Sequence, residues 1–308
     1  MSFIAPSAPQ IGYRGRFAPT PSGPLHLGSL LTALASWLDA RTRNGDWLLR
    51  IDDLDVERTV PGAADCLQRQ LEAHGLYWDG RPRYQSEHLD EYGEALEQLR
   101  RVHLLYACRC TRAQLRHSAR EGIDGPVYPG TCRRLALPEP GHALRLRAGS
   151  GAIGFDDRWQ GRQSRDLDCD IGDFVVWRRD GVAAYQLACA VDEAALGITD
   201  IVRGADLLGS TFRQLRVMDL LGLRRPAYAH LPVLCGADGR KLSKQNRAAP
   251  IDERDAGANL QRCLHWLGQE LPASGHSAPP RELLQWALRH WTPGRVPAVQ
   301  RLKVEHCA

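Results

Sequence analysis

The sequence predicts an α/β protein built around a parallel sheet, and three observations support this class. A short apolar strand is followed by a helix at Arg16–Thr42, and the same order recurs at Ile198–Gly222. A further apolar run at 47–51 follows the first helix after a short turn. Strands that alternate with helices are typical of a parallel sheet covered by helices. The chain has 308 residues, enough for one large core or two moderate ones.

The first unit is a strand at Arg16–Ala18, a two-proline turn, and a helix that we expect to begin near Pro24. Proline suits a first helical turn because the N–H groups there have no partner within the helix. Apolar residues recur at helical spacing as far as Thr42, and Asn44-Gly45 is typical of a left-handed cap. With the strand at 47–51, this segment is a parallel βαβ unit.

The middle of the chain is predicted to contain helices, strands and one hairpin. Segments with an apolar face and a charged back indicate helices, and alternating apolar residues indicate strands. Asp180-Gly181 suits the tight turn of a hairpin, and Tyr185 would lie on its second strand. The predicted elements are helices over 61–75 and 87–105, strands over 144–147 and 152–156, and hairpin strands over 173–178 and 182–191.

The last part returns to the alternation of strand and helix. The strand Ile198–Arg203, closed by Gly204, places Arg203 at its carboxyl end, where side chains enter an α/β ligand site. Leucines at helical spacing predict a helix over 206–222. The remaining predicted elements are a last core strand over 228–234 and helices over 259–267 and 281–290.

The turn within Arg16–Ser29 is a candidate anion site. A strand–turn–helix aims free N–H groups and the positive end of the helix dipole at one spot, which favours a nucleotide phosphate. His26 and Ser29 are three residues apart and can both donate toward that spot, while Gly28 lets a flat ring approach the backbone. The stretch alone also fits a helix cap followed by a surface histidine.

A second candidate segment, Arg240–Asn246, contains two of the three lysines of the chain, Lys241 and Lys244. Other basic positions are almost all arginine, so paired lysines favour a role for a compact, mobile ammonium group. The alternative is an ordinary solvated loop.

Composition excludes several classes of protein. The net charge is +4, and arginines outnumber acids between residues 100 and 165, which indicates a polyanionic partner unless coding bias explains the arginines. Nine cysteines, an odd number, do not suggest a disulfide framework. No secretory signal and no apolar run of roughly 18 residues is present. We expect a cytoplasmic, monomeric protein with no membrane partner.

Three cysteines suggest a metal site. Cys108 and Cys110 are one residue apart and Cys132 follows about twenty residues later, so the three thiols can converge on one tetrahedral ion such as zinc. A fourth ligand is open between His117, Tyr128, an acid and a water. Three buried structural thiols are the alternative.

Together these motifs resemble a known family. Pro21–Ser29 resembles the HIGH signature and Lys241–Gln245 the KMSKS signature of class I aminoacyl-tRNA synthetases, and the resemblance covers residues 12 to 247. It implies a Rossmann-like catalytic domain with an inserted zinc-bearing subdomain and a short helical C-terminal region. The implied division is 1–105 and 173–247 for the two catalytic halves, 106–172 for the insertion and 248–308 for the C-terminal region.

The family joins an amino-acid carboxylate to the α-phosphate of ATP, which is supplied with Mg²⁺. The resemblance implies that His26, Ser29, Lys241 and Lys244 stabilise the charge on the reacting phosphorus. It implies ATP contacts from Pro19, Ser22, Gly23, His26, Gly28 and Lys244.

Within the family, Arg16–Gly23 and Leu49–Asp55 resemble the glutamate branch. L-Glutamate has two carboxylates and an ammonium, so Arg16 and Arg203 would bind carboxylates, Asp52 the ammonium, and Tyr185 would close the wall. The implied glutamate-binding set is Arg16, Phe17, Ala18, Pro19, Thr20, Asp52, Tyr185 and Arg203. The chain departs from the family pattern at three positions. The family has Glu where Asp52 stands, and the shorter side chain implies weaker or water-bridged ammonium binding. The general motifs have His where Ser29 stands and Ser where Gln245 stands.

The resemblance is strongest to paralogues of glutamyl-tRNA synthetase that lack the anticodon-binding domain. It rests on the blocks at 181–188 and 197–206, the early end of the chain and the cysteine set. Such paralogues activate glutamate without tRNA and transfer it to queuosine at the first anticodon position of tRNA(Asp), so the anticodon loop is the expected partner. They imply Cys108, Cys110, Tyr128 and Cys132 as zinc ligands, with Tyr128 in place of His117.

Two other functions are alternatives to this interpretation of the sequence. A minimal glutamyl-tRNA synthetase that charges a tRNA 3′ end would need tRNA for glutamate-dependent pyrophosphate exchange. A catalytically decayed, zinc-containing tRNA-binding module would bind tRNA without any exchange, and the intact Lys241, Lys244, His26 and Arg203 argue against it.

Overall fold

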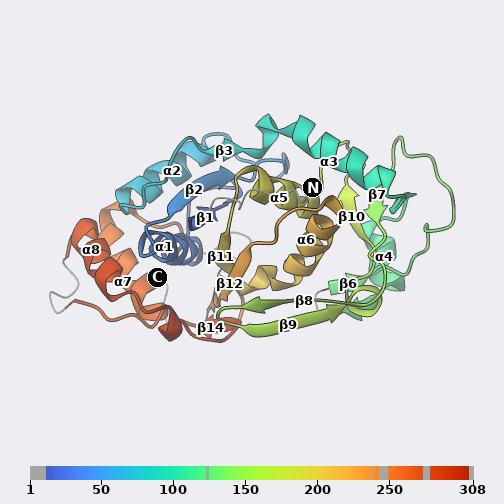
Figure 1. Ribbon diagram of the computed structural model, residues 1–308. Helices are drawn as coiled ribbons and strands as arrows, with labels where there is room; N and C mark the ends of the chain where they lie inside the picture. Colours follow the sequence, from blue (N-terminus) through green and yellow to red (C-terminus); the bar gives the residue numbers. More distant parts are fainter. Residues whose placement is uncertain (1–11, 123–124, 237, 243–248, 273–277, 305–308) are drawn as a thin grey trace, which may run out of the picture.

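The computed structural model describes residues 12–122, 125–236, 238–242, 249–272 and 278–304 (Figure 1). The helices are α1 Leu27–Arg41, α2 Ala63–Ala73, α3 Leu89–Arg101, α4 Arg112–Ser118, α5 Tyr185–Ala195, α6 Leu208–Leu221, α7 Ala256–Trp266 and α8 Pro280–His290. The strands are β1 Arg14–Phe17, β2 Asp46–Ile51, β3 Arg83–Tyr84, β4 Leu105–Cys108, β5 Arg120–Gly122, β6 Gly125–Val127, β7 Ala143–Leu146, β8 Ala152–Asp157, β9 Gly161–Asp166, β10 Phe174–Trp177, β11 Asp200–Gly204, β12 Ala227–Leu231, β13 Val233–Cys235 and β14 Arg301–Lys303.

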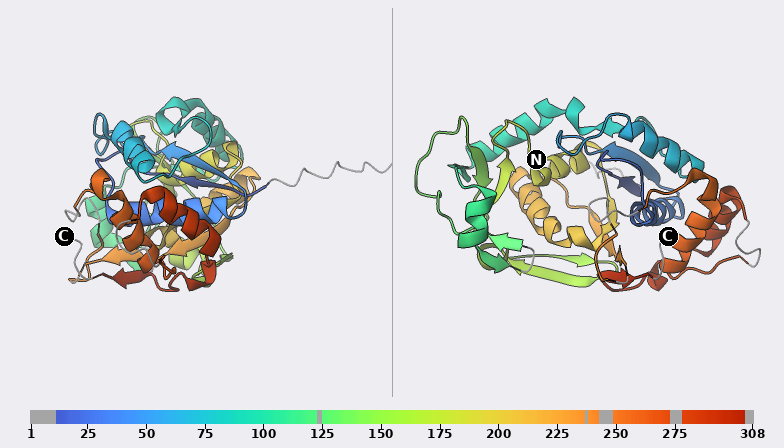
Figure 2. Two further views of the ribbon diagram at one scale, coloured as in Figure 1. Left: turned by 90° about the vertical axis from the view of Figure 1, so that its left-hand side faces the viewer. Right: turned by 180° about the vertical axis from the view of Figure 1, so that it is seen from behind.

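Parallel strands form the centre of the fold. β1 pairs with β2, and β11 pairs with β12, which in turn meets β8; all three pairings are parallel. The N–H of Thr199 donates to the carbonyl of Arg14 at 2.9 Å, which brings β11 alongside β1. Figure 2 shows α1, α7 and α8 grouped on one side of these strands and α5 and α6 on the other. The predicted α/β class is confirmed, and the carboxyl ends of β1 and β11 lie next to each other.

The helix α1 is the central helix of the larger core. It connects β1 to β2, which confirms the predicted βαβ unit, and apart from Thr32 its residues from Leu30 to Ala40 are buried between the sheet, α7 and α8. Burial on all sides explains why this helix is apolar around most of its circumference. The fixed position of α1 sets the direction of its N-terminus.

The start of α1 differs from the sequence expectation. The helix begins at Leu27 rather than near Pro24, and His26 is its N-cap with an extended backbone (φ −117°, ψ 168°). Leu25 is held outside the helix because its N–H donates to the side chain of Gln70 at 2.7 Å. The backbone of His26 also forms an isolated β-bridge with Pro250. These tertiary bonds override the tendency of proline to start a helix.

The predicted hairpin over 173–191 is largely wrong. Gly181 makes a turn with φ +82°, and Ala183 pairs back to Trp177, but the chain then enters α5 at Tyr185. The segment from Tyr185 to Ala195 is rich in Ala, Leu, Gln and Glu, which favour a helix over a strand. Tyr185 is therefore the first residue of a helix and not part of a strand.

Smaller differences concern the ends of elements. The predicted strand over 228–234 is two strands, β12 and β13, because Pro232 between them has no N–H to donate. The helix predicted over 87–105 ends at Arg101, and Leu105 begins β4. The pairing of β14 with β13 was not predicted. The other predicted helices and strands are present within a few residues of their expected bounds.

A third sheet, antiparallel and ordered β10-β7-β4, joins strands on both sides of the predicted boundary at residue 172. The four-part division of the chain stays a prediction. Within the described ranges, no helix combines the length and the apolar character that crossing a bilayer requires.

Candidate active site

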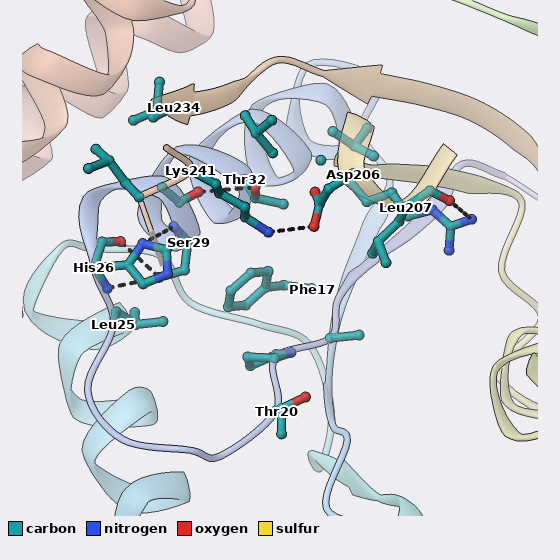
Figure 3. A pocket seen from close by; sticks show the side chains of 18 of the residues that line it. Phe17, Thr20, Leu25, His26, Ser29, Thr32, Asp206, Leu207, Leu234 and Lys241 are labelled. Atoms are coloured by element: carbon teal, nitrogen blue, oxygen red, sulfur yellow. Dashed lines mark hydrogen bonds and ion pairs between the residues drawn. The ribbon is translucent and has the colours of Figure 1, made fainter. Parts of the chain in front are cut away.

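A cavity of about 650 Å³ lies where β1 and β11 end and α1 begins (Figure 3). Its wall is completed by β13 and by Lys241 and Leu242, which follow that strand. The predicted site residues that line it are Arg16, Phe17, Ala18, Pro19, Thr20, Ser22, His26, Gly28, Ser29, Tyr185, Arg203 and Lys241. Of the predicted residues, Gly23 and Asp52 are not part of the lining, and Lys244 lies outside the described residues.

The two signature segments meet at this cavity. The N–H of Leu242 donates to the carbonyl of Leu234 at 2.8 Å, which folds the segment back along β13. A Cβ atom on Gly28 would lie 3.5 Å from the carbonyl oxygen of Leu242. The start of α1 and the segment at Lys241 are therefore in contact, although more than 200 residues of sequence separate them.

His26 and Ser29 form a reciprocal cap at the start of α1. The N–H of Ser29 donates to Nδ1 of His26 at 3.2 Å, and the N–H of His26 donates to Oγ of Ser29 at 2.9 Å. Oγ of Ser29 in turn donates to the carbonyl of His26 at 2.8 Å. A neutral imidazole that accepts at Nδ1 carries its proton on Nε2, so the cap also sets the tautomer of His26.

Gly28 makes room for this arrangement. A Cβ at position 28 would lie 3.1 Å from both Cε1 and Nδ1 of His26, closer than carbon atoms normally approach. The glycine therefore lets the imidazole lie against the backbone of the first helical turn, as the sequence indicated.

Lys241 extends across the cavity mouth to an acid that the sequence analysis did not single out. Its Nζ forms an ion pair with Oδ2 of Asp206 at 2.5 Å, and Figure 3 shows the pair spanning the space between β13 and the end of β11. The two side chains are 42% and 35% exposed, so the pair contributes little to stability. The pair places the ammonium group at the edge of the cavity, beside Asp206.

The floor of the cavity is a buried network of charges. Nε of Arg16 donates to Glu193 at 2.9 Å, and Nη1 of Arg50 approaches the same carboxylate at 3.2 Å. Burial raises the pKa of Glu193, but the guanidinium groups of Arg16 and Arg50 outweigh it and lower the pKa overall. Asp192, the preceding residue, accepts from Arg83 and Tyr92. This network was missed because Asp192 and Glu193 directly follow a segment predicted as a strand, and no spacing in the sequence links them to the distant arginines.

Asp52 belongs to this network rather than to the cavity wall. Its carboxylate accepts from Nε of Arg50 at 2.6 Å, and its side chain is buried. Burial raises the pKa of Asp52 despite the adjacent guanidinium group. The predicted contact between Asp52 and a ligand ammonium stays a prediction.

Arg203 is held by neutral partners. Nη1 donates to Oε1 of Gln214 at 2.9 Å, Nη2 to Oγ1 of Thr211 at 2.7 Å, and Nε to Nε2 of His230 at 3.1 Å. Within the described part of the chain, no carboxylate forms an ion pair with Arg203. Tyr185, 40% exposed at the first turn of α5, lines the same cavity.

The cysteine cluster lies in a separate small core. Cys108, Cys110 and Cys132 have their sulfur atoms within 4.8 Å of one another, and Sγ of Cys110 is 3.6 Å from Sγ of Cys132. Oη of Tyr128 lies 3.4 Å from Sγ of Cys108 and 3.6 Å from Sγ of Cys110. His117 points elsewhere: it is exposed, and its Nδ1 lies 2.9 Å from the carbonyl of Ala113. Three thiols and one phenol thus face a common point.

The electrostatics of this cluster suit a metal ion. Burial raises the pKa of Cys132, but hydrogen bonds from Tyr128 Oη and from the N–H of Arg109 outweigh it and lower the pKa to about 7. A guanidinium group, that of Arg145, lies 3.2 Å from Sγ of Cys108 and 3.8 Å from the ring centre of Tyr128. Burial raises the pKa of Cys110 in the same cluster, so the shift toward the thiolate, the form that binds metals, is seen at Cys132.

The fold and the site define a class I aminoacyl-tRNA synthetase. Residues 13–259 match the family described as tRNA synthetases class I (E and Q), catalytic domain, and the chain belongs to this family. Among its relatives is a protein of Chromobacterium violaceum named glutamyl-Q tRNA(Asp) synthetase, 54% identical over 288 residues, with 93% of this chain and 96% of the relative covered. A protein of the same name from Aromatoleum aromaticum is 52% identical, covering 92% of this chain and 90% of the relative.

Solved structures confirm the fold. The crystal structure of glutamate-tRNA synthetase from Elizabethkingia anophelis superposes with a TM-score of 0.78 and 24% identity, covering 95% of this chain and 68% of that protein. A glutamate tRNA ligase from Elizabethkingia meningosepticum, solved in complex with its amino acid, gives the same TM-score and identity.

Proposed function

We propose that this protein is a ligase that activates L-glutamate with ATP in the absence of tRNA and transfers the glutamyl group to queuosine at the first anticodon position of tRNA(Asp). The observation that carries the proposal is the near full-length similarity, up to 54% identity among the proteins compared, to proteins named glutamyl-Q tRNA(Asp) synthetase. The cavity in which both signature segments meet supports it. The products are pyrophosphate, then AMP and the modified tRNA.

The start of α1 is the proposed site of the ATP phosphates. The N–H groups of the first turn and the helix dipole attract the phosphates, and Nε2–H of His26 is a further donor. The carboxylate of glutamate attacks the α-phosphorus, the bond to pyrophosphate breaks, and charge develops on the equatorial oxygens. Pro19, Ser22, Gly23 and Gly28 would shape the nucleotide pocket, and Ser29 would act through the cap of His26.

The two lysines of the second segment complete this site. Lys241 would leave Asp206 for the phosphates of ATP when the nucleotide enters, because a triphosphate carries more negative charge than one partly exposed carboxylate. Lys244 has the same proposed role and lies outside the described residues. Removing one such donor should cost on the order of 3 kcal/mol of transition-state stabilisation.

Glutamate is proposed to lie between Arg16 and Arg203. Both guanidinium groups line the cavity, and a planar guanidinium can bind a carboxylate through two parallel hydrogen bonds. Phe17, Ala18, Pro19, Thr20 and Tyr185 would form the walls around the side chain. Asp52 would reach the ammonium through a water, since its own carboxylate is bound to Arg50.

We further propose that Cys108, Cys110, Tyr128 and Cys132 hold one structural zinc ion. Thiolates around tetrahedral zinc lie roughly 3.8 Å apart, given bonds of about 2.3 Å. Here Oη of Tyr128 lies 3.4 Å from Sγ of Cys108, Sγ of Cys110 lies 3.6 Å from Sγ of Cys132, and all three sulfur atoms lie within 4.8 Å of one another. The donor set therefore fits the ion. The ion would fix the loop around Cys132 against β4 and take no part in adenylate formation.

The test uses labelled glutamate with ATP and three acceptors: tRNA(Asp) with queuosine, tRNA(Asp) without it, and tRNA(Glu). The expected result is label on the queuosine-bearing tRNA(Asp) alone, with glutamate-dependent pyrophosphate exchange in the absence of any tRNA. Label on tRNA(Glu), or exchange that requires tRNA, would favour a glutamyl-tRNA synthetase. Retention of tRNA with no exchange at all would favour a decayed RNA-binding module.

A further inference from the structure

We propose that Asp157 and His230 form a relay that orients the guanidinium group of Arg203 toward the cavity, and so sets the affinity for a substrate carboxylate. The three residues come from three neighbouring strands, β8, β12 and β11. The inference rests on the proposed function in one respect, which is that Arg203 binds a carboxylate of glutamate. Asp157 and His230 do not line the cavity, so they are positioning residues.

The parallel pairing of the strands places the relay in one line. Arg203 of β11 and His230 of β12 are register partners, and Nε of Arg203 lies 3.1 Å from Nε2 of His230. Asp157 is the last residue of β8, and its Oδ2 lies 2.6 Å from Nδ1 of His230. Asp157, His230 and Arg203 are 4%, 0% and 3% exposed, so all three residues are buried. Little water reaches these bonds, so each carries its full orienting effect.

Asp157 determines which nitrogen of His230 carries the proton. Its carboxylate only accepts, so Nδ1 of His230 must donate. Arg203 only donates, so Nε2 of His230 must accept. Both hydrogen bonds therefore require the same neutral tautomer of His230, the one with its proton on Nδ1. Burial and the charges of Arg203 and Arg16 lower the pKa of His230 to about 4, although Asp157 opposes the shift, so the ring is neutral at physiological pH.

The side-chain hydrogen-bond partners of Arg203 are neutral, so they leave its positive charge in place. His230, Gln214 and Thr211 orient three of its nitrogens without cancelling its charge. Arg16 and Arg50, in contrast, are already paired with Glu193. Arg203 is therefore a cation of the cavity wall that is fixed in orientation and forms no ion pair with a carboxylate of the described chain, although its charge also acts on the nearby Glu193. That is the arrangement expected for a residue that recognises a carboxylate of a ligand.

The variant Asp157→Asn tests the relay, because the surroundings fix how the amide must lie. Oδ1 of Asp157 accepts the N–H groups of Trp159 at 3.0 Å and Gln160 at 2.9 Å. In the variant the amide oxygen must stay with these donors, so the NH₂ group faces Nδ1 of His230. His230 then carries its proton on Nε2, and that N–H opposes the N–H of Arg203.

We expect the Asp157→Asn variant to raise the KM for glutamate about tenfold or more, while the KM for ATP changes by less than about twofold. The ¹⁵N chemical shifts of His230 should show the proton moved from Nδ1 to Nε2, a readout that a merely structural role would not change. A changed tautomer with an unchanged KM for glutamate would overturn the relay. An unchanged tautomer would overturn it as well.

A second pair of variants covers the case in which Asp157→Asn does not fold. His230→Gln can still offer an amide oxygen to Nε of Arg203, whereas His230→Leu cannot. We expect glutamate to bind roughly tenfold more weakly to His230→Leu than to His230→Gln, with equal binding of ATP. Equal glutamate affinities would contradict the relay.

The variant Arg203→Lys separates this inference from the proposed function. If it binds glutamate as tightly as the wild type, the assignment of Arg203 to the carboxylate fails, and with it the basis of the relay. If it loses glutamate while the variants of Asp157 and His230 keep it, the proposed function stands and the relay alone is wrong.

Discussion

The guanidinium group of Arg16 and the carboxylate of Glu193 form a buried ion pair, with Nε 2.9 Å from Oε1 and exposed fractions of 4% and 2%. The pair connects the first strand of the fold to the helix α5, 177 residues later in the sequence. Arg50 approaches the same carboxylate from β2. One acid thus holds two arginines from two strands beneath the cavity.

Glu193→Gln should strongly destabilise the protein. The substitution keeps the shape but leaves the buried guanidinium group of Arg16 without its carboxylate, although Arg50 keeps Asp52, and breaking such a buried pair costs about 3–5 kcal/mol. Urea unfolding measures the loss. Asp46→Asn is the matched control, because it removes the exposed partner of Arg14 on the same strand and should cost less than about 1 kcal/mol. Equal losses in the two variants would contradict the importance assigned to Glu193.

Gly28→Ala should lower the activity strongly while the stability changes little. Alanine favours a helix over glycine by roughly 0.5–1 kcal/mol, so stability should not fall far. The new Cβ would press on the imidazole of His26 at 3.1 Å, and pyrophosphate exchange should fall more than about tenfold as the ring moves. Gly93→Ala in α3 is the control, since nothing lies within 4 Å of its Cβ, and it should keep full activity. Full exchange activity in Gly28→Ala would show that the imidazole position is not critical.

The burial of His230 predicts a dependence of stability on pH. Its folded pKa, about 4, lies below the value of about 6.5 expected for the unfolded chain. Between these values the unfolded chain binds a proton that the folded protein does not, so stability is full above pH 6.5 and falls as the pH decreases toward 4. The loss from this group is on the order of 3 kcal/mol.

Urea unfolding at several pH values between 4.5 and 7 measures this dependence. Glutamine at position 230 cannot titrate. The free energy of unfolding of His230→Gln should therefore depend less steeply on pH than that of the wild type, and the difference in slope should correspond to about one bound proton. Parallel curves for wild type and variant would mean that His230 is not the group that titrates.

The sequence predicted the parts of the site whose positions depend on local structure. The strand–turn–helix at Arg16–Ser29 and the position of Arg203 at a strand end follow from turn chemistry and periodicity, and both line the cavity. The segment at Lys241 was predicted from the scarcity of lysine, and it meets the start of α1 as expected.

The rest depends on contacts between distant segments. The helix that begins at Tyr185 was predicted as a strand because the Asp-Gly turn signal was given more weight than the helical preference of Ala, Leu, Gln and Glu, and its apolar face is buried in the same core as that of α6. Glu193 and His230 appeared to be ordinary residues of their elements. Their roles arise from Arg16, Arg50, Arg203 and Asp157, and no spacing along the chain indicates such partners.

The choice between Tyr128 and His117 as the fourth ligand gives a last prediction. Purified protein should contain about one zinc per chain by elemental analysis. Tyr128→Phe removes the phenol oxygen that lies 3.4 Å from Sγ of Cys108, so zinc should be released to a chelator about 10–100-fold more readily. His117→Ala should retain zinc like the wild type, because its ring lies on the exposed side of α4. Loss of zinc in His117→Ala with retention in Tyr128→Phe would reverse the assignment. Cys132→Ser should release the ion most readily of the three, since a serine hydroxyl does not ionise at neutral pH and cannot replace the thiolate.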